Sequence, residues 1–218
     1  MNLSDRAYDN NYNFVIALDG PSASGKGLIG NMIAKEFDLV CVQSSIIYRG
    51  LAYICMQNQI TPDDTHRIIE LSKTEDIILK VSNIDLNTEI IGELTSCIST
   101  IQKVRENLGY HLKKMIQTTP RIVMEGRDIG SVIAPNADLK IFITADINVR
   151  AKRRFNQLRI EGKECILSDV LDSLEGRDKR DRTRIAAPLK PAEDALVIDT
   201  SDLIPSKVIQ TIKDFIGK

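Results

Sequence analysis

The amino-acid sequence predicts an α/β fold in which helices flank a parallel sheet of five strands. Short apolar segments recur along the chain with few polar interruptions, as strands buried on both faces require. Longer stretches with helical periodicity separate these segments, and parallel neighbours need such crossovers. The alternation is typical of a doubly wound sheet. The expected strands are residues 14–18, 39–42, 122–124, 139–143 and 196–198.

Helices are expected in the intervals between these strands. The first follows a glycine-rich segment, and another precedes Gly126. A pair of helices follows the fourth strand, and the last helix closes the chain. Their predicted ranges are residues 26–37, 147–160, 167–182 and 206–216.

Two stretches do not fit this alternation. Between about residues 79 and 94 the text VSNIDLNTEIIG carries short β-like runs broken by Asn, Asp and Gly. We interpret it as a small inserted lobe. Residues 1–12 are polar and are expected to form a loose tail. No repeat or long linker interrupts the sequence, so residues 1–218 are interpreted as one domain.

Composition narrows the classes of partner. Of the 218 residues 43% are hydrophobic, which is enough for one compact core. The 29 Lys and Arg nearly balance the 30 Asp and Glu, so no overall charge attracts nucleic acid or an acidic membrane. No run approaches the ~18 apolar residues of a membrane span. The four cysteines lie far apart, which is typical of free thiols in a reducing cytosol. We expect a cytoplasmic monomer without nucleic-acid or membrane partners.

A glycine-rich segment follows the first predicted strand. It reads GPSASGK, matches the pattern G-x-x-x-x-G-K, and leads into an amphipathic helix. Backbone N–H groups of such a loop and the helix N-terminus surround phosphates, and the lysine adds a cation. The alternative is a glycine-rich turn that binds nothing. The residues assigned to a nucleoside triphosphate are Gly20, Pro21, Ser22, Ala23, Ser24, Gly25, Lys26, Gly27 and Leu28.

Arginines are spaced so that several share a helix face. Arg150, Arg153 and Arg154 would share one face, and Arg177, Arg180 and Arg184 another, together with Asp181. Guanidinium groups bind phosphoryl oxygens through two parallel hydrogen bonds, so such faces suit an anionic ligand. Solvated faces with interleaved charges are the alternative interpretation.

Two further short motifs follow predicted strands. Arg127 and Asp128 follow the third strand, and SSIIYR, which spans residues 44–49, follows the second. Because the carboxyl ends of parallel strands meet at one edge of a sheet, both motifs are expected to reach the same crevice as the phosphate loop.

Together these motifs resemble those of bacterial cytidylate kinases. The similarity runs nearly end to end through GPSASGKG, SSIIYR, VRE, GRDIG, RAKRR and RDKRDRTRIAAPLKPAEDALVIDTS. It implies a P-loop fold with a CMP-binding insert at about residues 60–118 and a mobile helical lid at about 150–180. It also implies the reaction of ATP and CMP to ADP and CDP with Mg²⁺, and dCMP as a second acceptor.

The same resemblance implies roles for individual residues. Lys26 and the loop amides would hold the ATP phosphates, and Ser44 would line the acceptor site. The groups that read the pyrimidine would be Ser96, Arg105 and Asp128. Those at the ribose would be Arg177 and Asp181. Those on the acceptor phosphate would be Arg49, Arg127 and Arg184, and those of the lid would be Arg153 and Arg154.

The motifs depart from the family pattern at three places. Gln43-Ser44-Ser45-Ile46 stands in place of Asp-Ser/Thr-Gly-Ala, Glu125 in place of Asp, and Leu28 in place of Thr. Gly27 and Leu28 also lack the hydroxyl with which many phosphate loops hold Mg²⁺, so the sequence assigns no metal ligand.

Other interpretations stay open beside this one. Another nucleoside monophosphate kinase, or a nucleotide-binding homologue with weak or no catalysis, would share most of the motifs. A switch GTPase would need an Asn-Lys-x-Asp motif for guanine, which the sequence lacks. A basic α/β scaffold that binds no nucleotide is the remaining alternative.

Overall fold

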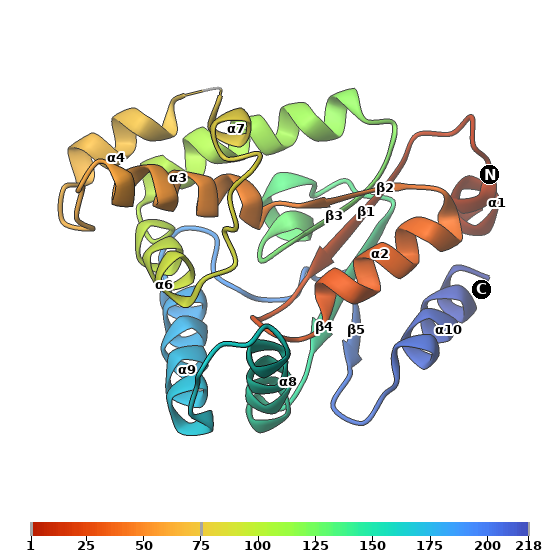
Figure 1. Cartoon of the computed structure of the whole chain (residues 1–218). Coiled ribbons are helices and arrows are strands. Elements are labelled where there is room, and N and C mark those ends of the chain that lie inside the picture. The colour runs from red at the N-terminus through yellow and green to blue at the C-terminus, as the bar shows by residue number, and fades with distance from the viewer. Residues whose placement is uncertain (1, 75, 218) are drawn as a thin grey trace.

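The structure is a computed structural model that describes residues 2–74 and 76–217. Five parallel strands form a sheet in the order β2-β3-β1-β4-β5 (Figure 1). The predicted strands are confirmed to within two residues at either end. They are β1 (Phe14–Asp19), β2 (Val40–Gln43), β3 (Arg121–Gly126), β4 (Leu139–Thr144) and β5 (Leu196–Asp199).

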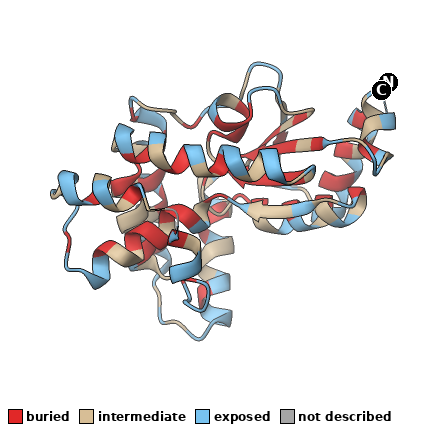
Figure 2. Cartoon of the chain, turned by 90° about the horizontal axis from the view of Figure 1, so that it is seen from above, coloured by how far each residue is buried: buried red, intermediate tan, exposed pale blue. Residues whose placement is uncertain are grey.

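Helices cover both faces of the sheet, and successive side chains of each strand alternate between them. Ile16 and Leu18 of β1 pack with α2 (Lys26–Phe37) and α10 (Pro205–Ile216), whereas Ala17 packs with α3 (Ser45–Gln57) and α7 (Gln102–Thr118). Figure 2 shows the buried residues gathered between the layers and the exposed residues on the outer faces of the helices. This two-sided burial explains why the strands read as continuous apolar runs.

β1 lies at the centre of the sheet, between β3 and β4. The chain crosses from β1 through α2 to β2 on one side, and later from β3 to β4 on the other side of β1. Such a reversal opens a crevice at the carboxyl ends of the strands. The loop after β1 and the loop after β3 therefore face the same space.

Between α3 and α7 the described residues form three helices. They are α4 (Thr65–Ser72), α5 (Ile77–Lys80) and α6 (Glu89–Ile98). The β-like interpretation of residues 79–94 is wrong, because residues 89–98 are helical. Thr88 caps α6 by accepting a hydrogen bond from the Ile91 amide at 3.3 Å, and Ile91 and Ile98 fall on its buried face. The Asn and Asp residues that suggested broken strands occupy the turn before this cap.

A helical hairpin formed by α8 (Ile147–Ile160) and α9 (Leu167–Thr183) projects below the sheet in Figure 1. Its own apolar cluster is small and consists of Ala151, Leu158, Val170 and Leu174. The buried guanidinium of Arg150 joins the two helices through an ion pair with Asp178 at 2.7 Å. The hairpin thus holds together through a few contacts of its own, apart from the two cores of the sheet.

The expectation of a loose N-terminal tail is also wrong for the described residues. Residues 3–8 form α1 (Leu3–Tyr8), whose first turn is capped by the Asn2 side chain. Ala7 is buried, and the Tyr8 ring lies 5.3 Å from the ring of Phe37. A mostly polar segment can form such a helix when its few apolar residues share one face. Among the described residues no helix has the length and apolar character of a membrane span.

Candidate active site

The loop between β1 and α2 adopts a backbone that only small residues tolerate. Gly20 has φ +150°, and a Cβ there would lie 2.0 Å from the carbonyl oxygen of Ile143 on β4. Gly25, with φ +94°, ends the loop at the N-cap of α2, and Ala23 also has a positive φ of 58°. These turns direct the loop around the helix N-terminus, where N–H groups lack intrahelical partners. The loop has the form of an anion cradle.

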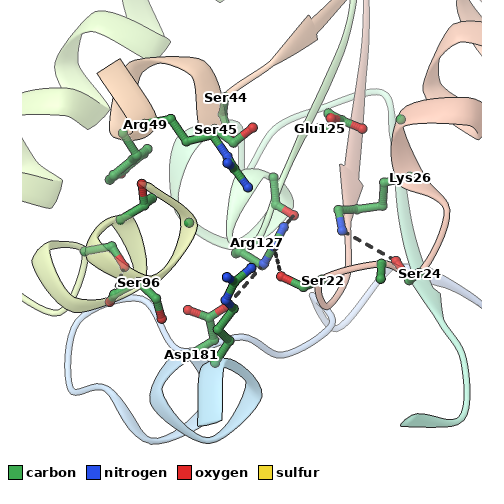
Figure 3. A pocket seen from close by; sticks show the side chains of 18 of the residues that line it. Ser22, Ser24, Lys26, Ser44, Ser45, Arg49, Ser96, Glu125, Arg127 and Asp181 are labelled. Atoms are coloured by element: carbon green, nitrogen blue, oxygen red, sulfur yellow. Dashed lines mark hydrogen bonds and ion pairs between the residues drawn. The ribbon is translucent and has the colours of Figure 1, made fainter. Parts of the chain in front are cut away.

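Lys26 is buried at the start of α2 and folds back on the loop. Its ammonium donates to the carbonyl oxygen of Pro21 at 2.6 Å. It also donates to Ser24 Oγ at 3.4 Å (Figure 3). Burial and, to a smaller extent, the charge of Arg127 lower the pKa of Lys26 to about 7, against the opposing charges of Glu125 and Asp19. The ammonium is therefore poorly compensated, and a nearby anion would stabilise its charged form.

A cleft of about 550 Å³ opens beside this loop. Its walls come from the loop itself, from α3 and α6, from the loop after β3, and from α8 and α9. Of the residues predicted for the site, Gly20 and Pro21 do not line the cleft and instead shape the loop. Those that do line it are Ser22, Ala23, Ser24, Gly25, Lys26, Gly27, Leu28, Ser44, Arg49, Ser96, Arg105, Arg127, Asp128, Arg153, Arg154, Arg177, Asp181 and Arg184.

Arg127 lies in the middle of the cleft and contacts both of its sides. Its guanidinium donates to Ser22 Oγ of the phosphate loop at 2.7 Å and to Asp181 Oδ2 of α9 at 3.2 Å (Figure 3). Gly126, directly before it, has no room for a side chain, because a Cβ would lie 2.7 Å from Ser44 Oγ. The loop after β3 thus brings a single guanidinium between the loop and the helical hairpin.

Asp128 and Arg105 form a buried ion pair at 2.5 Å, with the Arg105 guanidinium 5.5 Å from the ring of Tyr48. Arg184 donates to Asp181 Oδ1 at 3.2 Å and to the carbonyl oxygen of Ala187 at 2.7 Å. Within the described residues Nε of Arg105 and Nη2 of Arg184 are buried without a hydrogen-bond partner. Buried donors of this kind are costly unless a ligand accepts from them.

Positive charge is concentrated in the cleft. Burial, together with the charges of Arg177, Arg127 and Arg154, lowers the pKa of Arg49 to about 10. The Arg49 guanidinium donates to the carbonyl oxygen of Leu86 at 2.6 Å. An anionic ligand would relieve this repulsion, which favours binding of phosphate groups.

The arginines of the helical hairpin contact different partners. Arg154 and Arg177 both contact the Glu89 carboxylate, whereas Arg153 donates to Thr200 Oγ1 at 3.1 Å. Arg150, which shares a helix face with Arg153 in the sequence pattern, does not line the cleft. It is buried against Asp178 and donates to the carbonyl oxygen of Ser22 in the phosphate loop at 3.2 Å. Arg180 donates to Ser96 Oγ at 2.9 Å and so fixes that hydroxyl.

Glu125 and Gln43 fill the space where a hydroxyl beside Lys26 would lie. A Cβ on Gly27 would be 3.3 Å from Gln43 Nε2 and 3.8 Å from Glu125 Oε2. Burial raises the pKa of Glu125, and its Oε2 has no hydrogen-bond partner among the described residues. No cluster of three metal-ligating side chains occurs in the described part of the chain. An ion here would be bound through phosphate and water oxygens together with Glu125.

Sequence reasoning missed three residues that shape the site. Asp19 accepts hydrogen bonds from the amides of Ile129 and Gly130, at 2.8 and 2.7 Å, and so fixes the loop that carries Asp128. Glu89 pairs with two arginines of the hairpin, and the Tyr48 ring packs against Arg105. The sequence offered a signal for two of them: Asp19 lies directly before the glycine-rich loop, and Tyr48 lies within the SSIIYR motif.

Comparison with known proteins agrees with this geometry. A family model described as cytidylate kinase matches residues 16–218. A cytidylate kinase of Rickettsia bellii is 55% identical over 217 residues, which cover 100% of this chain and 99% of the relative. A cytidylate kinase of Rickettsia canadensis is 51% identical over 216 residues, 99% of this chain and 97% of the relative.

Solved structures support the fold. An uncharacterised protein from Eubacterium ventriosum superposes with a TM-score of 0.56 and 13% identity, covering 94% of this chain and 99% of its own. A gluconokinase from Sinorhizobium meliloti gives a TM-score of 0.52 and 11% identity, with 94% and 93% coverage. At this identity the likeness concerns the arrangement of sheet and helices. The chain has a P-loop kinase fold.

Proposed function

The chain belongs to the cytidylate kinase family, and we propose that its cleft transfers the γ-phosphoryl group of ATP to CMP, giving ADP and CDP. The observation that carries this proposal is the arginine-rich cleft beside the phosphate loop, in a chain that matches named cytidylate kinases along its full length. Phosphoryl transfer asks a protein to align donor and acceptor and to neutralise oxygen charge. The cleft can meet both requirements, because the phosphate loop and the arginines both line it.

The two sides of the cleft divide the work. The loop amides and Lys26 would bind the ATP phosphates. Their negative charge would raise the pKa of Lys26 and so keep the buried ammonium protonated. Arg49, Arg127 and Arg184 would bind the acceptor phosphate. Arg127, which already contacts Ser22 of the loop, would lie where donor and acceptor meet.

The helical elements supply closure and the acceptor pocket. We assign the CMP-binding insert to about residues 60–118 and the lid to about 150–180. The lid would place Arg153 and Arg154 on the transferring phosphate and exclude water that could otherwise hydrolyse ATP. Arg177 and Asp181, at the base of the lid, would contact the ribose.

Asp128 would recognise cytosine, supported by Arg105 and Ser96. The exocyclic amine of cytosine is a donor and pairs with a carboxylate, whereas the corresponding carbonyl of uracil would be repelled. The ion pair with Arg105 fixes the orientation of the Asp128 carboxylate. Asp128→Ala is therefore expected to reduce the ratio of CMP to UMP turnover at least tenfold, measured as kcat/KM for each acceptor. An unchanged ratio would contradict this role.

Mg²⁺ would lie beside the phosphate loop, next to Glu125 of β3. The buried Oε2 of Glu125 lacks a partner among the described residues and lies beside the start of α2. Glu125 and Gln43 would hold the ion's water shell. When bound, the ion neutralises the β- and γ-phosphate oxygens.

The decisive experiment couples ADP release to a spectrophotometric signal with ATP and Mg²⁺ and compares CMP, dCMP, UMP and AMP. We expect CMP to be preferred and dCMP to be used as a second acceptor. Preference for AMP or UMP would identify another nucleoside monophosphate kinase. ATP binding without turnover of any acceptor would identify a non-catalytic nucleotide-binding protein. The cytoplasmic location and the monomeric state stay predictions from the sequence.

A further inference from the structure

A short segment at the start of α6 contacts arginines from three different helices. The carbonyl oxygen of Leu86 accepts a hydrogen bond from Arg49 of α3 at 2.6 Å. The Glu89 carboxylate accepts from Arg154 of α8 at 2.9 Å and from Arg177 of α9 at 2.7 Å. Residues 86–89 thus collect guanidinium groups from the acceptor side and from both helices of the lid.

Glu89 is the acidic member of this segment. Burial opposes its ionisation, but the hydrogen bond from Arg154 and the charge of Arg177 outweigh that effect and lower the pKa of Glu89. Its carboxylate uses one oxygen for each arginine, since Oε1 accepts from Arg154 and Oε2 from Arg177. Without this anion the two guanidiniums would repel each other and Arg49.

The two arginines that pair with Glu89 are much less exposed to water than the members of a surface ion pair. The exposed fractions of the Arg154 and Arg177 side chains are 13% and 8%. Exposed pairs contribute little because water screens them and long side chains lose freedom. Here the arginines are largely buried, and a single carboxylate fixes the direction of both.

We propose that Glu89 is a positioning residue of the phosphoryl-transfer site, which orients Arg154 for the transferring phosphate and Arg177 for the acceptor nucleotide. Because it belongs to the acceptor insert and both arginines to the lid, it couples the two elements. Lid arginines then reach their working position when the insert is in place. The inference rests on the proposed kinase function.

The chain offers a matched control on the same helix. Glu93 lies one turn after Glu89 and has a similar exposed fraction, 47% against 41%. Its carboxylate pairs at 2.5 Å with Arg180, which does not line the cleft, and approaches Arg177 only at 3.6 Å. Glu93→Gln removes the same charge from the same helix without releasing Arg154.

The test compares kcat and KM for CMP in wild type, Glu89→Gln and Glu93→Gln. Misplacing a catalytic group can cost ten- to hundredfold, so Glu89→Gln is expected to lower kcat about tenfold and to raise KM for CMP. Glu93→Gln is expected to keep kcat within about threefold of wild type. A thermal melt checks that each variant is folded. If Glu89→Gln does not fold, Glu89→Asp takes its place, because its shorter carboxylate cannot reach both arginines.

A positioning role makes a second claim that a structural role does not. If Glu89 acts on kcat through Arg154, then Glu89→Gln should change kcat less than about twofold in an Arg154→Met background. Likewise its effect on KM for CMP should vanish in an Arg177→Met background. The proposal would be overturned if Glu89→Gln lowered kcat by the same factor in the Arg154→Met background as in wild type, or raised KM for CMP by the same factor in the Arg177→Met background as in wild type. A kcat of Glu89→Gln equal to that of Glu93→Gln would overturn it as well. Wild type that forms no CDP would instead overturn the proposed function.

Discussion

At the scale of a single residue, Gly20 determines how closely the phosphate loop approaches β4. Its φ is +150°, and any Cβ at this position would lie 2.0 Å from the carbonyl oxygen of Ile143, which leaves no room for a side chain. Gly20→Ala is expected to lower the free energy of unfolding by about 3 kcal/mol or more, because both backbone and neighbour must shift. Urea denaturation of wild type and variant measures this difference in the free energy of unfolding.

Gly176 of α9 is the matched control for this substitution. A Cβ there meets only Arg180 Nη1, at 3.7 Å, and the backbone is helical. Gly176→Ala should therefore raise the free energy of unfolding by about 0.5–1 kcal/mol. Equal effects at both positions would show that the close approach at Gly20 is not what requires glycine.

Lys26 makes stability depend on pH. Its pKa is about 7 in the folded protein and 10.5 in the reference state, so between these values the unfolded chain binds more protons. The free energy of unfolding should then rise with pH above 7, by at most about 1.4 kcal/mol per pH unit from this group. The slope between pH 7 and 9 should be smaller in Lys26→Met, measured by denaturation in the absence of nucleotide. The same variant should lose at least about a hundredfold in kcat.

Arginines illustrate what sequence can and cannot provide at this scale. Spacing along α8 places Arg150, Arg153 and Arg154 on neighbouring positions, but it does not identify the partner of each. Arg150 is buried against Asp178, Arg153 contacts Thr200, and Arg154 contacts Glu89. Each partner comes from a segment distant in sequence, so only the folded chain determines which arginine faces the cleft.

At the scale of elements, Asp19 joins β1 to η1 (Ile129–Ile133), a short π-helical turn that follows Asp128. Its carboxylate accepts from two backbone amides at the start of that turn. Asp19→Ala would leave both buried donors without a partner, at a cost of roughly 1–3 kcal/mol in stability. It should also raise KM for CMP severalfold, because the Asp128 loop loses its anchor.

Asp19→Asn should have an intermediate effect on both quantities, since an amide oxygen can accept while its NH₂ cannot. Thermal melts and acceptor titrations of the two variants measure this order. A normal KM for CMP in Asp19→Ala would show that other contacts position the loop.

Elements differ in how far the sequence predicts them. The strands were predicted because burial on both faces leaves an apolar run that little else produces. The prediction for α6 was wrong, since the Asn and Asp residues before Thr88 form the turn that precedes the Thr88 cap and do not break strands. The polar segment that forms α1 gave no periodic signal, and its packing depends on Phe37 and other residues far along the chain.

At the scale of the whole molecule, the two ends of the sheet have different roles. The carboxyl ends of the strands carry the cleft, whereas Arg121 lies at the amino end, where β3 begins. Its guanidinium donates to the carbonyl oxygens of Ala7 at 2.8 Å, Asp9 at 2.7 Å and Asp38 at 3.2 Å. This one side chain thus holds α1 and the end of α2 to the sheet.

Arg121→Met is expected to lower the free energy of unfolding by roughly 2–4 kcal/mol, because several carbonyl groups lose a charged donor. It should leave kcat and KM for CMP within about twofold of wild type at a temperature where the protein is folded, since the cleft lies at the opposite end of the strands. Arg182→Met, at an exposed position of α9, is the control and should change stability by less than about 0.5 kcal/mol. A fall in kcat as large as the fall in stability would show that the amino end of the sheet also maintains the active site.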